Sequence, residues 1–168
     1  GTDYMPEMYF GRFSATTVAQ VTNQVNKTLM HETYAMPDDS YLADAVLIAG
    51  MDNWYANSHG NGAINYATQN YFNAAHGIDT HAYLYPNSGS SITQIRANIS
   101  EGAAYVNYTA HGGVTDWSDP HFTISDINNL QNENKYAYVI GNCCLTSKFD
   151  QGECFAEAWL RATNKGGI

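Results

Sequence analysis

The chain of 168 residues is long enough for one domain with a sizeable core, and its 44% of hydrophobic residues excludes a disordered polymer. The formal net charge is −9, from 16 acidic and 7 basic residues, and no basic stripe is present. We therefore expect no nucleic acid partner, whereas bound cations such as Ca²⁺ are compatible with this charge. No apolar run reaches the roughly 18 to 20 residues that cross a bilayer, so we expect no membrane span.

Apolar periodicity predicts strands and helices that alternate along the chain. In chain order these are a strand over 9–14, a helix over about 18–29, a strand over 45–50, a helix over 64–75, a strand over 81–85, a helix over 92–99, a strand over 103–109, a helix over 123–130, a strand over 136–140 and a helix over 153–163. The alternation indicates an α/β sandwich with a mostly parallel sheet.

Two of these elements have a distinctive pattern. The first helix is preceded by the N-cap residues of segment 14–17, and four of its residues recur at helical spacing and give it one apolar face: Val18, Val21, Val25 and Leu29. The run AVLIAG over 45–50 is continuously apolar, which is typical of a central strand covered on both faces.

Three predicted strands are followed by residues that can carry chemistry. Asp52 follows the strand over 45–50, His111 follows the strand over 103–109, and Cys144 follows the strand over 136–140. In open α/β sheets ligands bind outside the carboxyl ends of the strands. We therefore expect these three side chains to lie at one edge of the sheet.

A cysteine beside a histidine predicts nucleophilic catalysis, because an imidazole favours the thiolate and transfers its proton. The glycines after His111 allow the N–H of Gly112 or Gly113 to approach a reacting carbonyl, and the N–H of Cys144 can supply a second donor. Asp52 can hold the imidazole in the required tautomer. Because side chains alternate along a strand, Cys144 points to the cleft if Cys143 points into the core.

Other interpretations of these residues remain open. A cysteine at a strand end is commonly a small buried residue, and three cysteines leave at least one thiol unpaired. A zinc site could use His111, Cys143, Cys144 and Cys154, although adjacent cysteines do not match the usual Cys-x₂-Cys spacing. The remaining histidines form no recognised metal spacing and are expected at the surface; they are His31, His59, His76, His81 and His121. Of these, His59 could lie near the cleft.

Several segments resemble those of the gingipains, which are secreted cysteine endopeptidases with a caspase-like catalytic fold. In order along essentially the whole chain they are DYMPEMY (3–9), LIAGMD (47–52), NYTAHGG (107–113), TDW and SDP (115–120), IGNCCLT (140–146), FD (149–150) and CFAEAWLRA (154–162). The lysine-specific branch is the more similar one, because it carries both AHG and GNCC in this form.

The resemblance implies a set of site residues. Cys144 would be the nucleophile, His111 the general acid and base, and Asp52 the third member, with the N–H groups of Gly112 and Cys144 binding the oxyanion. Thr109 and Asn142 would line the pocket for the side chain before the scissile bond. Asp3, the carbonyl of Met5, and Glu7 would hold a structural Ca²⁺, for which a solvated acidic loop is the alternative. No cofactor is expected for catalysis.

The resemblance also implies a caspase-like three-layer sandwich, of which this chain is a part. Residues 1–40 would end the N-terminal subdomain, and residues 41–168 would form the first part of the catalytic subdomain. The remaining part, bound as a second chain, would cover the exposed sheet edge. Arginine-specific members carry a pocket acid in the loop after Asp52, but residues 53–78 contain no Asp or Glu. Lysine is therefore favoured over arginine.

The expected function is hydrolysis of protein or peptide substrates by a secreted or cell-surface cysteine endopeptidase, through a Cys-His(-Asp) thioester mechanism. Two alternatives are a non-catalytic or truncated caspase-like module that binds peptides, and a maturation protease that acts on secreted cargo.

Overall fold

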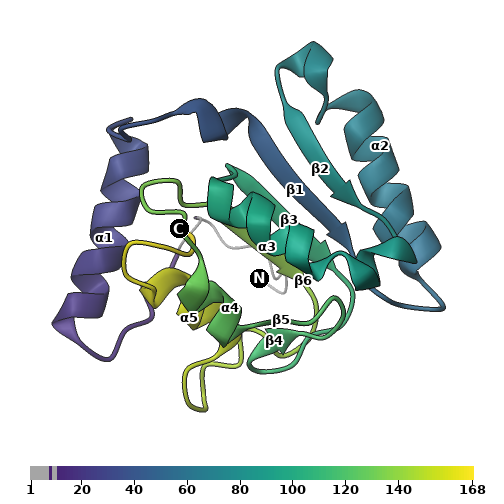
Figure 1. The fold of residues 1–168 in the computed structure, drawn as a ribbon. Coiled ribbons are helices and arrows are strands. Elements are labelled where there is room, and N and C mark those ends of the chain that lie inside the picture. Colours follow the sequence, from purple (N-terminus) through teal and green to yellow (C-terminus); the bar gives the residue numbers. More distant parts are fainter. Residues whose placement is uncertain (1–7, 9–10) are drawn as a thin grey trace.

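A four-stranded parallel sheet organises the molecule (Figure 1). The structure is a computed structural model and describes residue 8 and residues 11–168. The strands lie in the order β2-β1-β3-β6, with the bounds β1 (Asp44–Ala49), β2 (Asp79–Tyr83), β3 (Tyr105–Thr109) and β6 (Tyr138–Asn142). Every neighbouring pair is parallel, so their carboxyl ends meet at one edge, as the sequence predicts.

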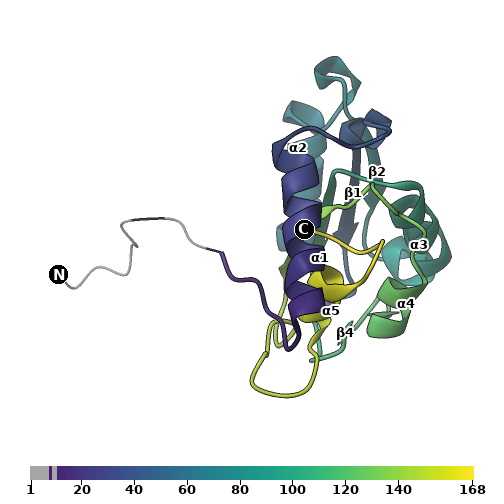
Figure 2. The same cartoon turned by 90° about the vertical axis from the view of Figure 1, so that its left-hand side faces the viewer.

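Helices cover both faces of the sheet. They are α1 (Val18–Glu32), α2 (Gly62–Asn70), α3 (Ile92–Glu101), α4 (Ile124–Asn129) and α5 (Phe155–Arg161), with 3₁₀ turns η1 (Ser40–Ala43), η3 (Ala74–His76) and η4 (Asn87–Ser90), a π-helical turn η2 (Ala56–Asn61) and a hairpin of β4 (Asp116–Trp117) and β5 (Phe122–Thr123). Figure 2 shows α2 on one side of the strands and α3 and α4 on the other. This confirms the predicted three-layer α/β fold with a parallel sheet.

Strand β1 lies inside the sheet, between β2 and β3, and residues 45–49 are all buried. Val46 and Ile48 pack into the main core with Ile95 of α3, whereas Leu47 packs on the opposite face with Ile64 of α2. The continuous apolar run therefore serves both faces, as expected for a central strand.

Several predicted boundaries were wrong. The helix expected over 64–75 ends at Asn70, because the Asn73 side chain accepts from the N–H of Ala75 and begins a separate 3₁₀ turn. Residues 11–14 form no strand, and residues 9 and 10 lie outside the described part. The last strand, β6, ends two residues later than predicted. Within the described residues, no helix has the length and hydropathy needed to cross a bilayer.

Helix α1 packs against the rest of the protein with the face opposite to the apolar face predicted from the sequence. Thr17 caps it as predicted, by accepting from the N–H of Gln20. However, Val18 and Leu29 are 82% and 52% exposed, whereas Gln24 and Lys27 are each 2% exposed. The buried polar side chains make hydrogen bonds to backbone carbonyls, which an apolar face cannot do.

Lys27 is the centre of this contact. Its Nζ lies within 3.4 Å of four carbonyl oxygens at and beyond the end of α5: those of Trp159, Leu160, Lys165 and Gly167. Carbonyls at the end of a helix lack intrahelical partners. The ammonium group satisfies them and so fixes α1 against the C-terminal segment.

We expect Lys27→Met to lower the free energy of unfolding by about 1–3 kcal/mol, because buried carbonyls lose their donor. Equilibrium urea denaturation measures this loss. Lys165→Met is the matched control, since Lys165 Nζ donates to the single carbonyl of Asn128 at an exposed position, and its effect should stay within about 0.5 kcal/mol. Equal losses in the two variants would contradict the role given to Lys27.

Candidate active site

The carboxyl ends of three adjacent strands open onto one cleft. Thr109 at the end of β3 pairs in register with Asn142 at the end of β6. The cleft has a volume of about 420 Å³. Its lining residues are Asp52, Tyr55, Ala56, His59, Gly60, Thr109, Ala110, Asn142, Cys143 and Cys144. Of the three strand-end residues predicted to meet, Asp52 and Cys144 line this cleft together with His59, and His111 contacts Asp52.

Asp52 is held on two sides. Its Oδ1 accepts from the backbone N–H groups of Trp54 at 2.7 Å and Tyr55 at 2.8 Å, and its Oδ2 lies 3.0 Å from His111 Nε2. The two backbone donors, and then the charge of His111, keep the pKa of Asp52 below its ordinary value. An ionised carboxylate in this position orients the imidazole.

His111 is fixed through its backbone and remains open through its side chain, which is 64% exposed. Its carbonyl accepts from the Tyr108 hydroxyl at 2.7 Å and from the Ser118 N–H at 3.0 Å. The Tyr108 ring stacks on Trp117 at 4.7 Å between centroids, and Trp117 is buried in the core. The aromatic core therefore positions the loop that carries the imidazole.

Gly112 lies where this loop meets the loop of Cys144. A Cβ on Gly112 would lie 2.7 Å from Thr146 Cγ2 and 2.9 Å from the Cys144 carbonyl oxygen. Gly112 pairs with Trp117 in an antiparallel bridge. The hydrogen bonds of this bridge run from the Gly113 N–H to the Asp116 carbonyl and from the Ser118 N–H to the His111 carbonyl. Among the described residues, the N–H groups of Gly112 and Cys144 donate no hydrogen bond. Both are free to bind a developing oxyanion.

The three cysteines have different environments. Cys144 is exposed and Cys154 is buried at the start of α5. Cys143 is half-buried against the main core, with Sγ 3.4 Å from Thr146 Oγ1, and burial raises the pKa of its thiol. This agrees with the predicted alternation, in which Cys143 faces the core and Cys144 faces the cleft.

The structure tests the alternative zinc site but not the predicted calcium site. Among the described residues, the one group of three close ligand side chains is Asp44, Asp79 and His81, so the alternative zinc set of His111 and the three cysteines does not come together. His81 and His31 were expected at the surface and are half-buried. The calcium residues Asp3, Met5 and Glu7 lie outside the described part of the chain.

Sequence reasoning missed the hairpin of β4 and β5, which brings Trp117 and Ser118 to the His111 loop. Two-residue strands are too short for an alternating pattern, so periodicity could not find them. It also missed Tyr55, which contributes its N–H to Asp52 and its side chain to the cleft. The position of Tyr55 three residues after a strand-end acid is the signal that was available.

We expect Gly112→Ala to lower kcat/KM for peptide hydrolysis by about 10²- to 10³-fold, because the added methyl group displaces the Cys144 loop and with it one oxyanion donor. Steady-state kinetics on a peptide substrate measures the loss. Gly113→Ala is the matched control, since a Cβ there would first meet the Asp116 carboxylate at 3.0 Å, and a side-chain end can move. Full activity of Gly112→Ala would argue against this donor.

Comparison with known proteins agrees with the geometry. The model for Peptidase family C25 matches residues 1–168. Lys-gingipain HG66 of Porphyromonas gingivalis is 44% identical over 165 residues, which cover 98% of this chain and 9% of that relative. The chain therefore spans only a small part of the curated relatives it matches.

Solved structures show the same likeness. A structure described as that of a protease has a TM-score of 0.89 and 40% identity, covering 99% of this chain and 36% of that chain. The crystal structure of the Arg-specific cysteine proteinase gingipain R has a TM-score of 0.79 and 26% identity, covering 99% of this chain and 39% of that chain.

Proposed function

The chain belongs to peptidase family C25, and from this premise we propose that it is the nucleophile-bearing part of a cysteine endopeptidase. The observation that carries the proposal is that Cys144 and Asp52 line one cleft at the carboxyl ends of the strands, with His111 3.0 Å from Asp52. Since the chain covers 36% of one similar solved structure, the activity is proposed for the complete protein.

The proposed reaction is acyl transfer. The Cys144 thiolate attacks the scissile carbonyl carbon, and the N–H groups of Gly112 and Cys144 bind the oxyanion that forms. Protonated His111 gives its proton to the leaving amine, which departs as the thioester forms. Neutral His111 then takes a proton from water, which hydrolyses the thioester and releases Cys144. Asp52 acts by holding the imidazole through its 3.0 Å contact.

We propose cleavage after a basic residue, with Lys favoured over Arg. The 44% identity to a Lys-gingipain supports this preference, as does the lack of any Asp or Glu over 53–78. Thr109 and Asn142 line the cleft and would contact the substrate side chain. Asp52 is the one acid among the lining residues and is already paired with His111, so the carboxylate that recognises Lys would come from outside this segment.

Peptides that differ only in the residue before the scissile bond test the proposal. With the complete protein, we expect kcat/KM for Lys to exceed that for Arg, and to exceed that for norleucine, the neutral analogue of similar length, by more than about a hundredfold, because a buried carboxylate would lose its partner. Preference for Arg would overturn the specificity. Absence of cleavage of all three peptides would overturn the endopeptidase itself.

We further propose that the protein acts outside the cell or at its surface on protein substrates, and that its N-terminal segment holds a structural Ca²⁺ through Asp3, Met5 and Glu7. The calcium proposal rests on the donor types alone, which are carboxylate and carbonyl oxygens. The remaining part of the catalytic unit would cover β6, the outer strand, on which Tyr138 and Ile140 are 55% and 37% exposed.

A further inference from the structure

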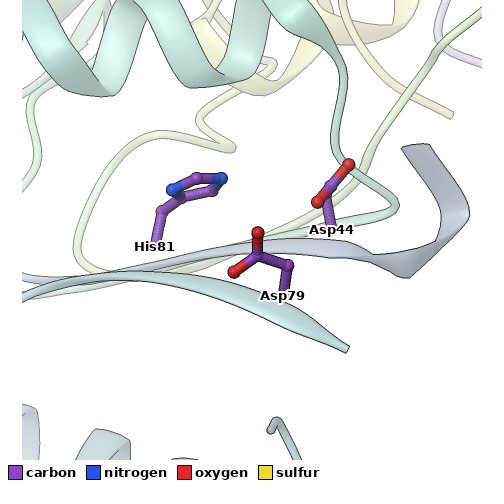
Figure 3. Close-up of side chains that lie close together, drawn as sticks. All are labelled: Asp44, Asp79 and His81. Carbon is purple, nitrogen blue, oxygen red and sulfur yellow. The ribbon is translucent and has the colours of Figure 1, made fainter. Parts of the chain in front are cut away.

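A second cluster of chemically active side chains lies at the end of the sheet opposite the cleft. Asp44 begins β1 and Asp79 begins β2, and the two residues are register partners in neighbouring parallel strands. His81 follows Asp79 by two residues and pairs with Val46. Residues two apart on a strand share a face, so the three side chains rise from one face of the sheet, as Figure 3 shows.

The ligand atoms of this cluster are close together, and within the described part of the chain they have no ion-pair or hydrogen-bond partner. One carboxylate oxygen of Asp44, one of Asp79 and one ring nitrogen of His81 all lie within 4.8 Å of one another. Over residue 8 and residues 11–168, none of the three side chains makes an ion pair, and none appears among the side-chain hydrogen bonds. All three ligand atoms are therefore available to a bound ion.

The electrostatics of the cluster also favour a cation. Asp44 is half-buried, and its carboxylate lies close to that of Asp79. The nearby cation Lys135 is already paired with Asp38, at 2.7 Å. Two carboxylates thus lie close together, one half-buried and one exposed, in a chain of net charge −9.

We propose that Asp44, Asp79 and His81 bind a first-row divalent metal ion of the zinc type. Imidazole and carboxylate together suit Zn²⁺ and its neighbours, whereas Ca²⁺ and Mg²⁺ select oxygen ligands alone. Metal–ligand bonds of about 2.0–2.2 Å place tetrahedral ligand atoms about 3.4 Å apart, so small side-chain rotations bring the three atoms to that spacing. Water takes the fourth position.

The site lies away from the catalytic residues, and it joins the outer strand β2 to β1. An ion there neutralises the two carboxylates and holds the exposed strand to its neighbour. Metal binding at this cluster therefore stabilises the fold without taking part in peptide hydrolysis, and it is independent of the proposed protease function.

Metal titration of the complete protein tests the site. The Cys144→Ala form removes the exposed thiol as a competing ligand, and Zn²⁺ binding is measured by calorimetry and Co²⁺ binding by its visible absorption. We expect His81→Gln and Asp79→Asn each to weaken binding by more than about tenfold. His76→Gln, which changes an exposed histidine outside the cluster, should leave it unchanged. Equal affinity in His81→Gln and its parent, or no binding to the parent, would overturn the proposal.

A measurement without substitution guards against misfolded variants. Diethyl pyrocarbonate modifies accessible histidines, and peptide mass mapping reports each one. Zn²⁺ should protect His81 and leave His76 reactive, since only His81 belongs to the cluster. Equal modification of His81 with and without Zn²⁺ would overturn the site.

Discussion

Replacing Cys144 by alanine is expected to reduce kcat/KM for peptide hydrolysis by at least about a thousandfold, because Cys144 is the one exposed thiol among the three cysteines and so the one placed to form the thioester. The exposed thiol lies in the cleft together with Asp52. Steady-state kinetics on the complete protein, with a Lys-containing peptide, measures the loss. The folded state should be unaffected, since an exposed side chain makes few packing contacts.

Cys143→Ala provides the control for this experiment. Cys143 is the sequence neighbour of Cys144, but it packs against the core, and burial raises the pKa of its thiol. A thiol that stays protonated is a poor nucleophile, so Cys143→Ala should retain activity within about threefold, while losing a small part of its stability. If Cys143→Ala were inactive and Cys144→Ala active, the assignment of the nucleophile would be reversed.

His111→Ala should lower kcat/KM by about a thousandfold or more, because both proton transfers then lack their donor and acceptor. The imidazole is held by Asp52 at 3.0 Å and remains exposed to substrate. The loss should fall mainly on kcat, since proton transfer stabilises the transition state more than the bound substrate.

His59→Ala is the matched control, because His59 carries an imidazole that lines the cleft with Asp52 and Cys144. Its ring packs edge-on against Tyr55 at 5.4 Å and contacts the Ser58 hydroxyl, and it has no ion pair with a carboxylate among the described residues. We expect kcat for His59→Ala to stay within about threefold of the parent. A larger loss of kcat in His59→Ala than in His111→Ala would show that His59, and not His111, is the general base.

The variants Cys144→Ala and His111→Ala also distinguish the proposed enzyme from the alternative, a module that only binds peptides. In an enzyme, Cys144→Ala and His111→Ala stop hydrolysis but still bind a peptide substrate, which fluorescence anisotropy detects. In a module that only binds peptides, the unsubstituted protein shows binding and no turnover. Cargo maturation by the same chemistry would appear as cleavage of a folded precursor at a Lys site.

The sequence was sufficient to predict that Asp52 and Cys144 reach one cleft and that His111 lies beside Asp52. Apolar runs define the strands, parallel strands bring their carboxyl ends to one edge, and Asp52, His111 and Cys144 each follow such a run. This inference needs only the order of the elements, and errors of two residues in strand boundaries did not affect it. Strand β6 ends at Asn142 instead of residue 140, yet Cys144 still reaches the cleft.

Other features depend on long-range contacts that local periodicity does not encode. The buried side of α1 is decided by carbonyl oxygens near the end of α5, more than a hundred residues away, which hydrogen-bond to Lys27 and Asn23. The Asp44–Asp79–His81 cluster depends on the register between β1 and β2. A histidine with no recognised spacing in the sequence can therefore still meet two carboxylates across neighbouring strands.

The measurement that tests the central claim most directly is covalent labelling of the complete protein with a peptidyl chloromethyl ketone that carries Lys, followed by peptide mass mapping. The account predicts one adduct, on the Sγ of Cys144, which His111→Ala strongly slows. An adduct on Cys143 or Cys154 instead, or no adduct on any cysteine, would contradict the claim that Cys144 is the nucleophile of this cleft.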